Sequence, residues 1–363
     1  MTEQEQKEAR VRELLEERGL DGLLLRRASS FSWATCGASS YINTASDYGE
    51  AALLYAPGHR YLIANNIEAP RLAHEEGLAA QGWEFLTYDW YSPDSPLDRV
   101  TEGMRLGADH PHPDADDVSA DVSRLRAQLT PEEGQRFRDL GQLCGEAMGA
   151  AIAQVRPGQT EHEIAGILSR ESATRGAWPV VDLVATDERI FAYRHPLPTS
   201  KQLERYAMLV LCGRMHGLVC SITRLVHFGS LPDELRRKQE AVLRVDAAFL
   251  SATRPGATLR DVFERAVREY AAVGYPDEWR LHHQGGTAGY EGREELGTPS
   301  ASGTVIEGQA YAWNPSITGV KSEDTILIGA DGNTAITQVP GWPAITVEVD
   351  GQSFERPTIL EVR

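Results

Sequence analysis

His195 stands in a segment that suits proton transfer. Pro196 and Pro198 follow it closely, stiffen the backbone and help to hold the imidazole in one direction. A fixed imidazole suits a general acid or base. The alternative is a loop histidine with a structural role, and this segment alone favours that alternative.

A second candidate segment carries two adjacent imidazoles, His282 and His283. They precede a glycine-rich stretch at residues 284–289. Because glycine has no side chain, such a stretch lets the backbone approach a ligand closely. It could equally be a plain loop. Phosphate binding is a poor interpretation, because the stretch lacks the spacing and the lysine of a P-loop.

The cysteines offer little chemistry. Cys212 and Cys220 flank an expected hairpin turn that contains His216, but their spacing is not one that zinc sites use. A buried free cysteine behaves as a small hydrophobic residue. With Cys36 and Cys144 included, the sequence has no C-x-x-C pair, which favours reduced thiols in a cytoplasmic protein. It also has no G-x-S-x-G, so a serine nucleophile of the α/β-hydrolase type is unsupported.

The first 128 residues read as alternating helix and strand. Apolar residues recur at helical spacing up to Leu20, and Gly19 suits the end of the first helix. Strands are expected at 22–26, 51–55 and 60–64. The polar, proline-interrupted stretch 109–117 is expected to be a surface loop near the end of this domain.

A new organisation begins near Thr130, which suits a helix N-cap, with Pro131 at the first helical position. We place the domain boundary between residues 128 and 129. A hairpin is expected from strands 206–214 and 218–228. Later strands are expected at 310–313, at 324–328 and near the C-terminus, with a turn at 331–333.

A short motif occurs twice in this second part. Residues 156–164 and 254–262 share the pattern Arg-Pro-Gly-x-Thr, and each copy follows a long amphipathic helix, at about 135–155 and 234–252. Pro-Gly turns the chain and Thr caps the next helix. The pair suggests a duplicated helix–helix unit packed on a shared sheet. The alternative is a common helix–turn–helix signal.

Composition limits the partners. The 363 residues predict roughly two domains, because single cores rarely exceed about 250–300 residues. The 36 basic and 53 acidic residues give a net charge of −17, which repels nucleic acid and anionic membrane surfaces. The charged N-terminal segment is not a signal peptide, and no apolar run is long enough to span a bilayer, so we expect a cytoplasmic protein.

Several ordered motifs resemble those of the creatinase/prolidase/aminopeptidase P superfamily, whose pita-bread fold is shared with methionine aminopeptidase. The resemblance covers about residues 129–340. Its motifs are HPLPT at 195–199, CSITR at 220–224, HHQGG at 282–286, YAWNP at 311–315 and GVKSED at 319–324. It implies an α+β or α/β two-domain fold, with a creatinase-type α/β domain at 1–128. Residues 129–363 would form a pita-bread domain, in which pseudo-twofold helix pairs pack on a curved antiparallel sheet.

The superfamily's metallopeptidases hold two divalent ions through two Asp, one His and two Glu. By the resemblance, four of those positions carry other residues here: Cys212, Ser221, Gly286 and Asn314. Only the last glutamate is retained, as Glu323. Hard divalent cations need several anionic oxygen ligands. We therefore expect no dinuclear Mn, Zn or Co site and no other cofactor.

Other parts of the family's site persist. The resemblance gives His195 the acid/base role known from creatinase, and it places His282 and Glu323 beside it as catalytic residues. Arg293 replaces the second catalytic histidine of the metallopeptidases and Lys321 replaces an arginine. With Asn314, these two form the expected substrate-binding set, a cationic pocket that suits a carboxylate. The alternative for Arg293 and Lys321 is solvated surface charge.

Two functions rank nearly equal. The first is metal-independent hydrolysis of a small C–N bond, in an amide, an amidine or an X-Pro-like dipeptide. The second is a catalytically inactive homologue that binds a small carboxylate or peptide. A metallopeptidase with a rearranged site ranks well below both. The expected partners are a small molecule or dipeptide and a second copy of the chain in a homodimer, with no nucleic acid and no membrane.

Overall fold

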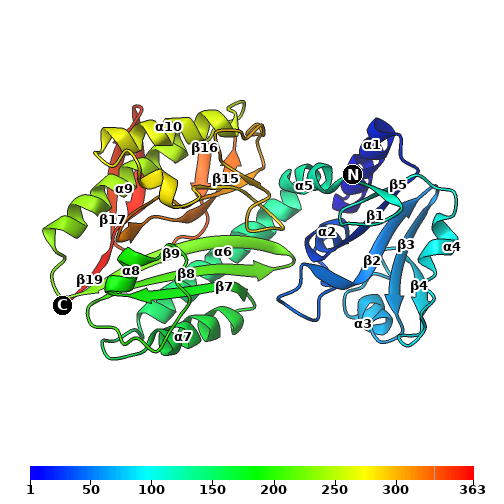
Figure 1. Ribbon diagram of the computed structural model, residues 1–363, viewed down its shortest axis with the longest axis horizontal. Helices are drawn as coiled ribbons and strands as arrows, with labels where there is room; N and C mark the ends of the chain where they lie inside the picture. The colour runs from blue at the N-terminus through cyan, green and yellow to red at the C-terminus, as the bar shows by residue number, and fades with distance from the viewer. Residues whose placement is uncertain (331) are drawn as a thin grey trace. The chain divides into compact units, whose positions relative to one another are not determined.

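The computed structural model describes residues 1–330 and 332–363, so the first residue of the turn expected at 331–333 lies outside the described residues. The chain divides into two compact units, residues 1–132 with 216–218, and residues 133–215 with 219–363 (Figure 1). The boundary that we predict between residues 128 and 129 stays a prediction. No helix among the described residues is long and apolar enough to cross a membrane.

The first unit is built on a six-stranded sheet in the order β4-β3-β2-β1-β5-β6. Its strands are β1 (Gly22–Arg27), β2 (Tyr48–Ala56), β3 (His59–Asn65), β4 (Glu84–Tyr88), β5 (Leu106–Ala108) and β6 (Ala115–Asp117). Its helices are α1 (Glu3–Arg18), α2 (Ala28–Ala34), α3 (Ala69–His74), α4 (Leu97–Thr101) and α5 (Ser119–Ala127). The three predicted strands are confirmed, and Gly19 ends α1 in the left-handed conformation.

The stretch 109–117 is not simply a surface loop, so that expectation is wrong in part. Its last three residues form the edge strand β6 beside β5. Asp109 is fully buried, and its carboxylate accepts hydrogen bonds from the backbone N–H groups of Arg26 and Arg27, at the end of β1. These partners satisfy a buried charge that the local sequence pattern assigned to solvent.

The second unit contains two main sheets. One has the order β19-β9-β8-β7 and the other the order β11-β10-β12-β15-β16. The first contains β7 (Trp178–Thr186), β8 (Tyr206–Met215), β9 (Leu218–Phe228) and β19 (Leu360–Val362). The second contains β10 (Gly285–Ala288), β11 (Glu295–Leu296), β12 (Ala310–Trp313), β15 (Asp324–Gly329) and β16 (Gly332–Ala335). Two further hairpins pair β13 (Ser316–Ile317) with β14 (Val320–Lys321) and β17 (Ala344–Val349) with β18 (Gln352–Pro357).

Two helix pairs accompany these sheets (Figure 1). They are α6 (Pro131–Ile152) with α7 (Glu161–Ala173), and α9 (Asp233–Ala252) with α10 (Leu259–Ala272); the short helices are α8 (Glu188–Ala192) and η1 (Glu278–Leu281). Helix α7 packs against β7 and β8, whereas α9 packs against α10, β14 and β17. The core between α9 and the second sheet includes a stacked pair, Phe249 and Trp313, with ring centroids 4.5 Å apart.

The repeated motif has the same structure in both copies. Gly158 and Gly256 have φ values of +91° and +90°, which a residue with a side chain rarely adopts. The Gly158 N–H donates to the Leu203 carbonyl, and the Gly256 N–H donates to the Val305 carbonyl. Each copy of the motif therefore makes one equivalent backbone hydrogen bond to a later segment of the chain. Thr160 and Thr258 then cap α7 and α10 through their hydroxyl oxygens. The duplicated helix–helix unit is therefore confirmed, but its two copies accompany two separate sheets and not one shared sheet.

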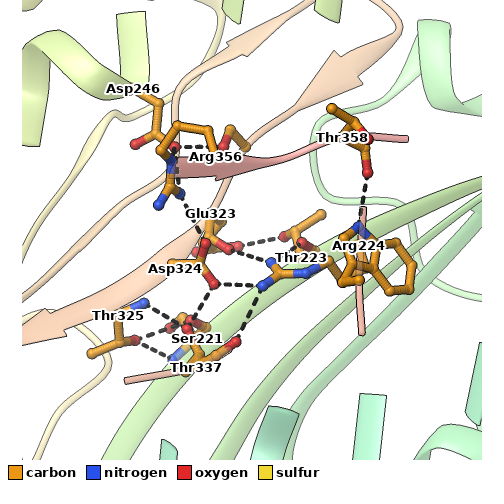
Figure 2. A network of polar contacts seen from close by, with 12 residues as sticks. Ser221, Thr223, Arg224, Asp246, Glu323, Asp324, Thr325, Thr337, Arg356 and Thr358 are labelled. Carbon is orange, nitrogen blue, oxygen red and sulfur yellow. Dashed lines mark hydrogen bonds and ion pairs between the residues drawn. The ribbon is translucent and has the colours of Figure 1, made fainter. Parts of the chain in front are cut away.

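The two sheets meet where β9 lies beside the residue that precedes β15. The Thr223 N–H of β9 donates to the Glu323 carbonyl, which forms an isolated antiparallel bridge. Next to it, Arg224 donates to Asp324 over 2.8 Å, and Asp324 also accepts from Arg356 over 2.8 Å (Figure 2). All three side chains are buried. This ion network joins β9, β15 and β18. It holds the backbone in place next to Glu323, the residue directly before β15.

Candidate active site

Three histidines gather at one place in the second unit. His195 lies in the loop between α8 and β8, and His282 and His283 follow η1 directly, just before β10. The Nε2 atoms of His195 and His282 are 3.1 Å apart. Ring centroids lie 5.3 Å apart for His195 and His283 and 4.7 Å apart for His282 and His283. His282 is buried, whereas the other two rings are exposed.

The surroundings hold these imidazoles in the neutral form. Burial, reinforced by the positive charge of Lys321, lowers the pKa of His282 to about 2. Desolvation within the cluster and the charge of Arg293 lower the pKa of His283 to about 4. The pKa of His195 is also lowered, first by desolvation and then by Lys321. At neutral pH each ring therefore keeps a nitrogen lone pair for a proton or another Lewis acid.

Glu323 is the centre of a second cluster. Its carboxylate accepts from Lys321 Nζ over 2.7 Å, from Arg293 Nη2 over 3.0 Å and from the Thr223 hydroxyl. Burial alone would raise the pKa of this carboxyl, but the charges of Lys321 and Arg293 and the hydrogen bonds lower it to about 2. Glu323 is therefore ionised and engaged at both oxygens.

Two of the other positions that the resemblance assigns to metal ligands, Cys212 and Ser221, are linked to this cluster. Cys212 of β8 contacts Ser221 of β9, with Sγ and Oγ 3.2 Å apart, and Arg293 Nη1 donates to the same Ser221 oxygen over 3.1 Å. Burial raises the pKa of the Cys212 thiol, and the Glu323 charge raises it further. Cys212 is therefore a neutral thiol at neutral pH.

The other two of these positions, Asn314 and Gly286, lie at the end of one strand and within another strand of the second sheet. Asn314 directly follows β12, and its buried Oδ1 has no hydrogen-bond partner among the described residues. Gly286 lies in β10 between β11 and β12. A Cβ atom at Gly286 would come within 2.0 Å of the Glu295 carbonyl oxygen, so the backbone leaves no room for a side chain there.

The structure thus brings the sequence-predicted residues together in two groups. Ser221, Arg293, Lys321 and Glu323 form one polar cluster, and His195 and His282 form the other. The side chains of Arg293 and Lys321 are only 13% and 5% exposed, so the alternative of solvated surface charge is wrong. The catalytic and substrate-binding roles that the sequence suggests for these residues stay predictions.

Sequence reasoning gave no role to two residues of the site. Thr223 donates to Glu323, and its place in the CSITR segment was the available signal. His283 completes the imidazole group, and its position next to His282 was the signal there. In neither case does local sequence reveal a contact with a residue that lies about ninety to a hundred positions away.

A pair of β-sheets flanked by duplicated helix pairs, with polar residues gathered where the sheets meet, defines the pita-bread class of proteins. Residues 135–330, more than half of the chain, match metallopeptidase family M24. The chain therefore belongs to that family, within the creatinase/prolidase/aminopeptidase P superfamily. The predicted fold class is confirmed.

Known relatives agree with this assignment. The Xaa-Pro dipeptidase of Pyrococcus horikoshii is 24% identical over 350 residues, which cover 92% of this chain and 97% of that protein. The Xaa-Pro dipeptidase of Pyrococcus furiosus is 28% identical over 232 residues, 61% of this chain, and the match spans slightly less than two thirds of that enzyme, 66%. The solved structure of an Xaa-Pro dipeptidase from Bacillus anthracis superposes with a TM-score of 0.80 at 20% identity, over 99% of this chain and 100% of that one, which shows a shared fold.

Proposed function

We propose that this protein is a metal-independent hydrolase of a small C–N bond, in an amide, an amidine or an X-Pro-like dipeptide, with His195 as the acid/base. The observation that carries the proposal is the pairing of Glu323 with Lys321 and Arg293. Two fixed cations stand beside the one carboxylate retained among the family's five ligand positions. Fixed positive charges can stabilise a developing oxyanion, as metal ions do in other peptidases.

The donor set does not fit two divalent cations. Cys212 offers a neutral thiol, Ser221 a hydroxyl and Asn314 an amide, whereas Gly286 offers no side chain. Glu323 already accepts from two cations and a hydroxyl. Hard cations require anionic oxygen ligands, so we infer that the dinuclear centre typical of the family's metallopeptidases is lost here, and no step of the proposed reaction uses it.

Other residues of the site can take part in different steps of the hydrolysis. His195 is exposed and neutral, so it can take a proton from water and return it to the leaving nitrogen. The Oδ1 atom of Asn314, which has no partner within residues 1–330 and 332–363, can accept a hydrogen bond from a substrate N–H. A small cavity beside His282 and Lys321, lined in part by Ile190, Tyr193 and Met208, has room for about one water molecule.

Hydrolysis after removal of metal tests the proposal. Protein dialysed against EDTA is assayed on X-Pro dipeptides and on guanidino acids, and we expect turnover in the presence of the chelator. His195→Gln should lower kcat about 10²–10⁴-fold, the usual contribution of a general acid/base. His162→Gln is the matched control, because His162 is an exposed histidine on α7. Turnover that appears only after Mn²⁺ or Zn²⁺ is added would refute metal independence.

A second candidate is an inactive homologue that binds a small carboxylate or peptide. One observation favours it: both oxygens of Glu323 are engaged, so this carboxylate is not free to activate water. In that case X-Pro dipeptides or guanidino acids would raise the melting temperature without any product being formed. Product formation by the EDTA-treated protein would exclude this candidate.

A further inference from the structure

The three histidines form a compact group of nitrogen ligands. One ligand atom from each of His195, His282 and His283 can be chosen so that all three lie within 4.8 Å of one another. The three residues come from two loops that the fold holds together, the one after α8 and the one after η1. None of them is among the five positions at which the family's metallopeptidases hold their two ions.

We propose that His195, His282 and His283 bind one borderline transition-metal cation of the Zn²⁺ type. In tetrahedral zinc sites the Zn–N bond is about 2.0–2.1 Å, so two ligand nitrogens lie about 3.3 Å apart. The Nε2 atoms of His195 and His282 are 3.1 Å apart, close to that tetrahedral edge. Three protein ligands leave the fourth position open, as in catalytic zinc sites generally.

A second layer of contacts orients His282. Its Nδ1 lies 3.2 Å from the Ser316 hydroxyl, and Ser316 is fixed by Tyr270, whose hydroxyl accepts from the Ser316 N–H and donates to the Ser316 carbonyl. When Nδ1–H donates to Ser316, the lone pair of the neutral ring is on Nε2, which faces His195. A hydrogen bond of this kind is what usually orients a metal-bound imidazole.

His283 is available as the third ligand. Its ring makes no hydrogen bond within residues 1–330 and 332–363, and its ring contacts are with His195 and His282. A neutral imidazole is the form that binds metal.

The charges nearby determine what the fourth ligand is. Lys321 and Arg293 are partly offset by Glu323, so the surroundings carry one net positive charge before metal is added. Such a site favours an anion, such as hydroxide or a carboxylate, at the open position. A bound cation would also occupy the Nε2 lone pair of His195. Metal binding and proton transfer by His195 would therefore exclude each other.

Calorimetric titration with Zn²⁺ tests the site without any activity assay. The full chain is first dialysed against EDTA and then against chelator-free buffer, and we expect one equivalent of Zn²⁺ to bind. His283→Gly should weaken binding at least 100-fold while leaving His195 and His282 in place. Ser316→Ala should weaken it about 10-fold, as loss of a second-layer contact does. His162→Gln should bind as the unchanged protein does.

Co²⁺ provides a second readout. A four-coordinate Co²⁺ site gives intense visible d–d absorption, which we expect in the unchanged protein and in His162→Gln, and which should be lost in His195→Gln. Binding of less than 0.2 equivalents would overturn the proposal, as would Zn²⁺ affinity unchanged by His283→Gly. Because these readouts report metal alone, an absence of hydrolysis would refute the proposed reaction without affecting the metal site.

Discussion

At the scale of single residues, Gly286 is a position that has no room for a side chain. The backbone of β11 occupies the space into which a side chain at this position would extend. A carbonyl oxygen in a paired strand cannot rotate away as a flexible side chain can. A side chain at this position would therefore require the sheet itself to shift.

We predict that Gly286→Ala destabilises the protein by about 3 kcal/mol or more, because the new Cβ would lie 2.0 Å from the Glu295 carbonyl oxygen. Urea unfolding measures the change in the free energy of unfolding. The control is Gly166→Ala on the exposed face of α7, where nothing lies within 4 Å of the added Cβ. That variant should be stabilised by about 0.5–1 kcal/mol. Equal effects of the two substitutions would contradict the close backbone contact.

At the scale of elements, the repeated helix starts depend on their threonine caps. Thr160 accepts from the Glu163 N–H while the Glu163 carboxylate accepts from the Thr160 N–H, and Thr258 accepts from the Asp261 N–H. Each of these bonds satisfies an otherwise unpaired N–H of the first helical turn.

We predict that Thr160→Ala and Thr258→Ala each cost about 1 kcal/mol of unfolding free energy, because each removes one N-cap acceptor. Thr→Ser at either position keeps the hydroxyl and should cost much less. Urea unfolding of the four variants gives the comparison. If Ala and Ser were equivalent at both positions, the caps would contribute nothing and the repeat would be held by its backbone bonds alone.

Elements with strong local signals were predictable from the sequence. The β8–β9 hairpin was expected at 206–214 and 218–228, and its turn places His216 and Gly217 at φ values of +51° and +78°, as a tight two-residue hairpin requires. The stretch 109–117 was not predictable, because the partners that bury Asp109 lie more than eighty residues earlier. Local polarity cannot show such a partner.

The same reason limits prediction of the site. The sequence identified Arg293, Lys321 and Glu323 one by one through motif positions. Their mutual ion pairs depend on the junction of the two sheets, which Arg224 and Asp324 hold together (Figure 2). The contact between His195 and His282 spans 87 positions and likewise appears only in the folded chain.

At the scale of the whole molecule, the buried imidazole makes stability depend on pH. The pKa of His282 is about 2 in the folded protein and 6.5 in an unfolded chain. Between these values the unfolded chain binds a proton that the folded one excludes. The contribution of His282 to the free energy of unfolding is therefore complete above pH 6.5, and it declines as the pH falls below 6.5. The slope is about 1.4 kcal/mol per pH unit for one proton. Asp182 has the opposite effect. Burial raises its pKa to about 6, so its contribution to the free energy of unfolding decreases as the pH rises from 3.8 to about 6.

Comparison with His282→Gln separates these two effects, because Asp182 is present in both proteins and its contribution cancels. We predict that the stability of the unchanged protein relative to His282→Gln falls by about 2 kcal/mol between pH 6.5 and pH 4.5. Urea unfolding at several pH values, with EDTA present so that no metal competes for the imidazole, measures this difference. A difference that stays constant over this range would mean that His282 binds its proton equally well in the folded and the unfolded chain, so that folding does not lower its pKa.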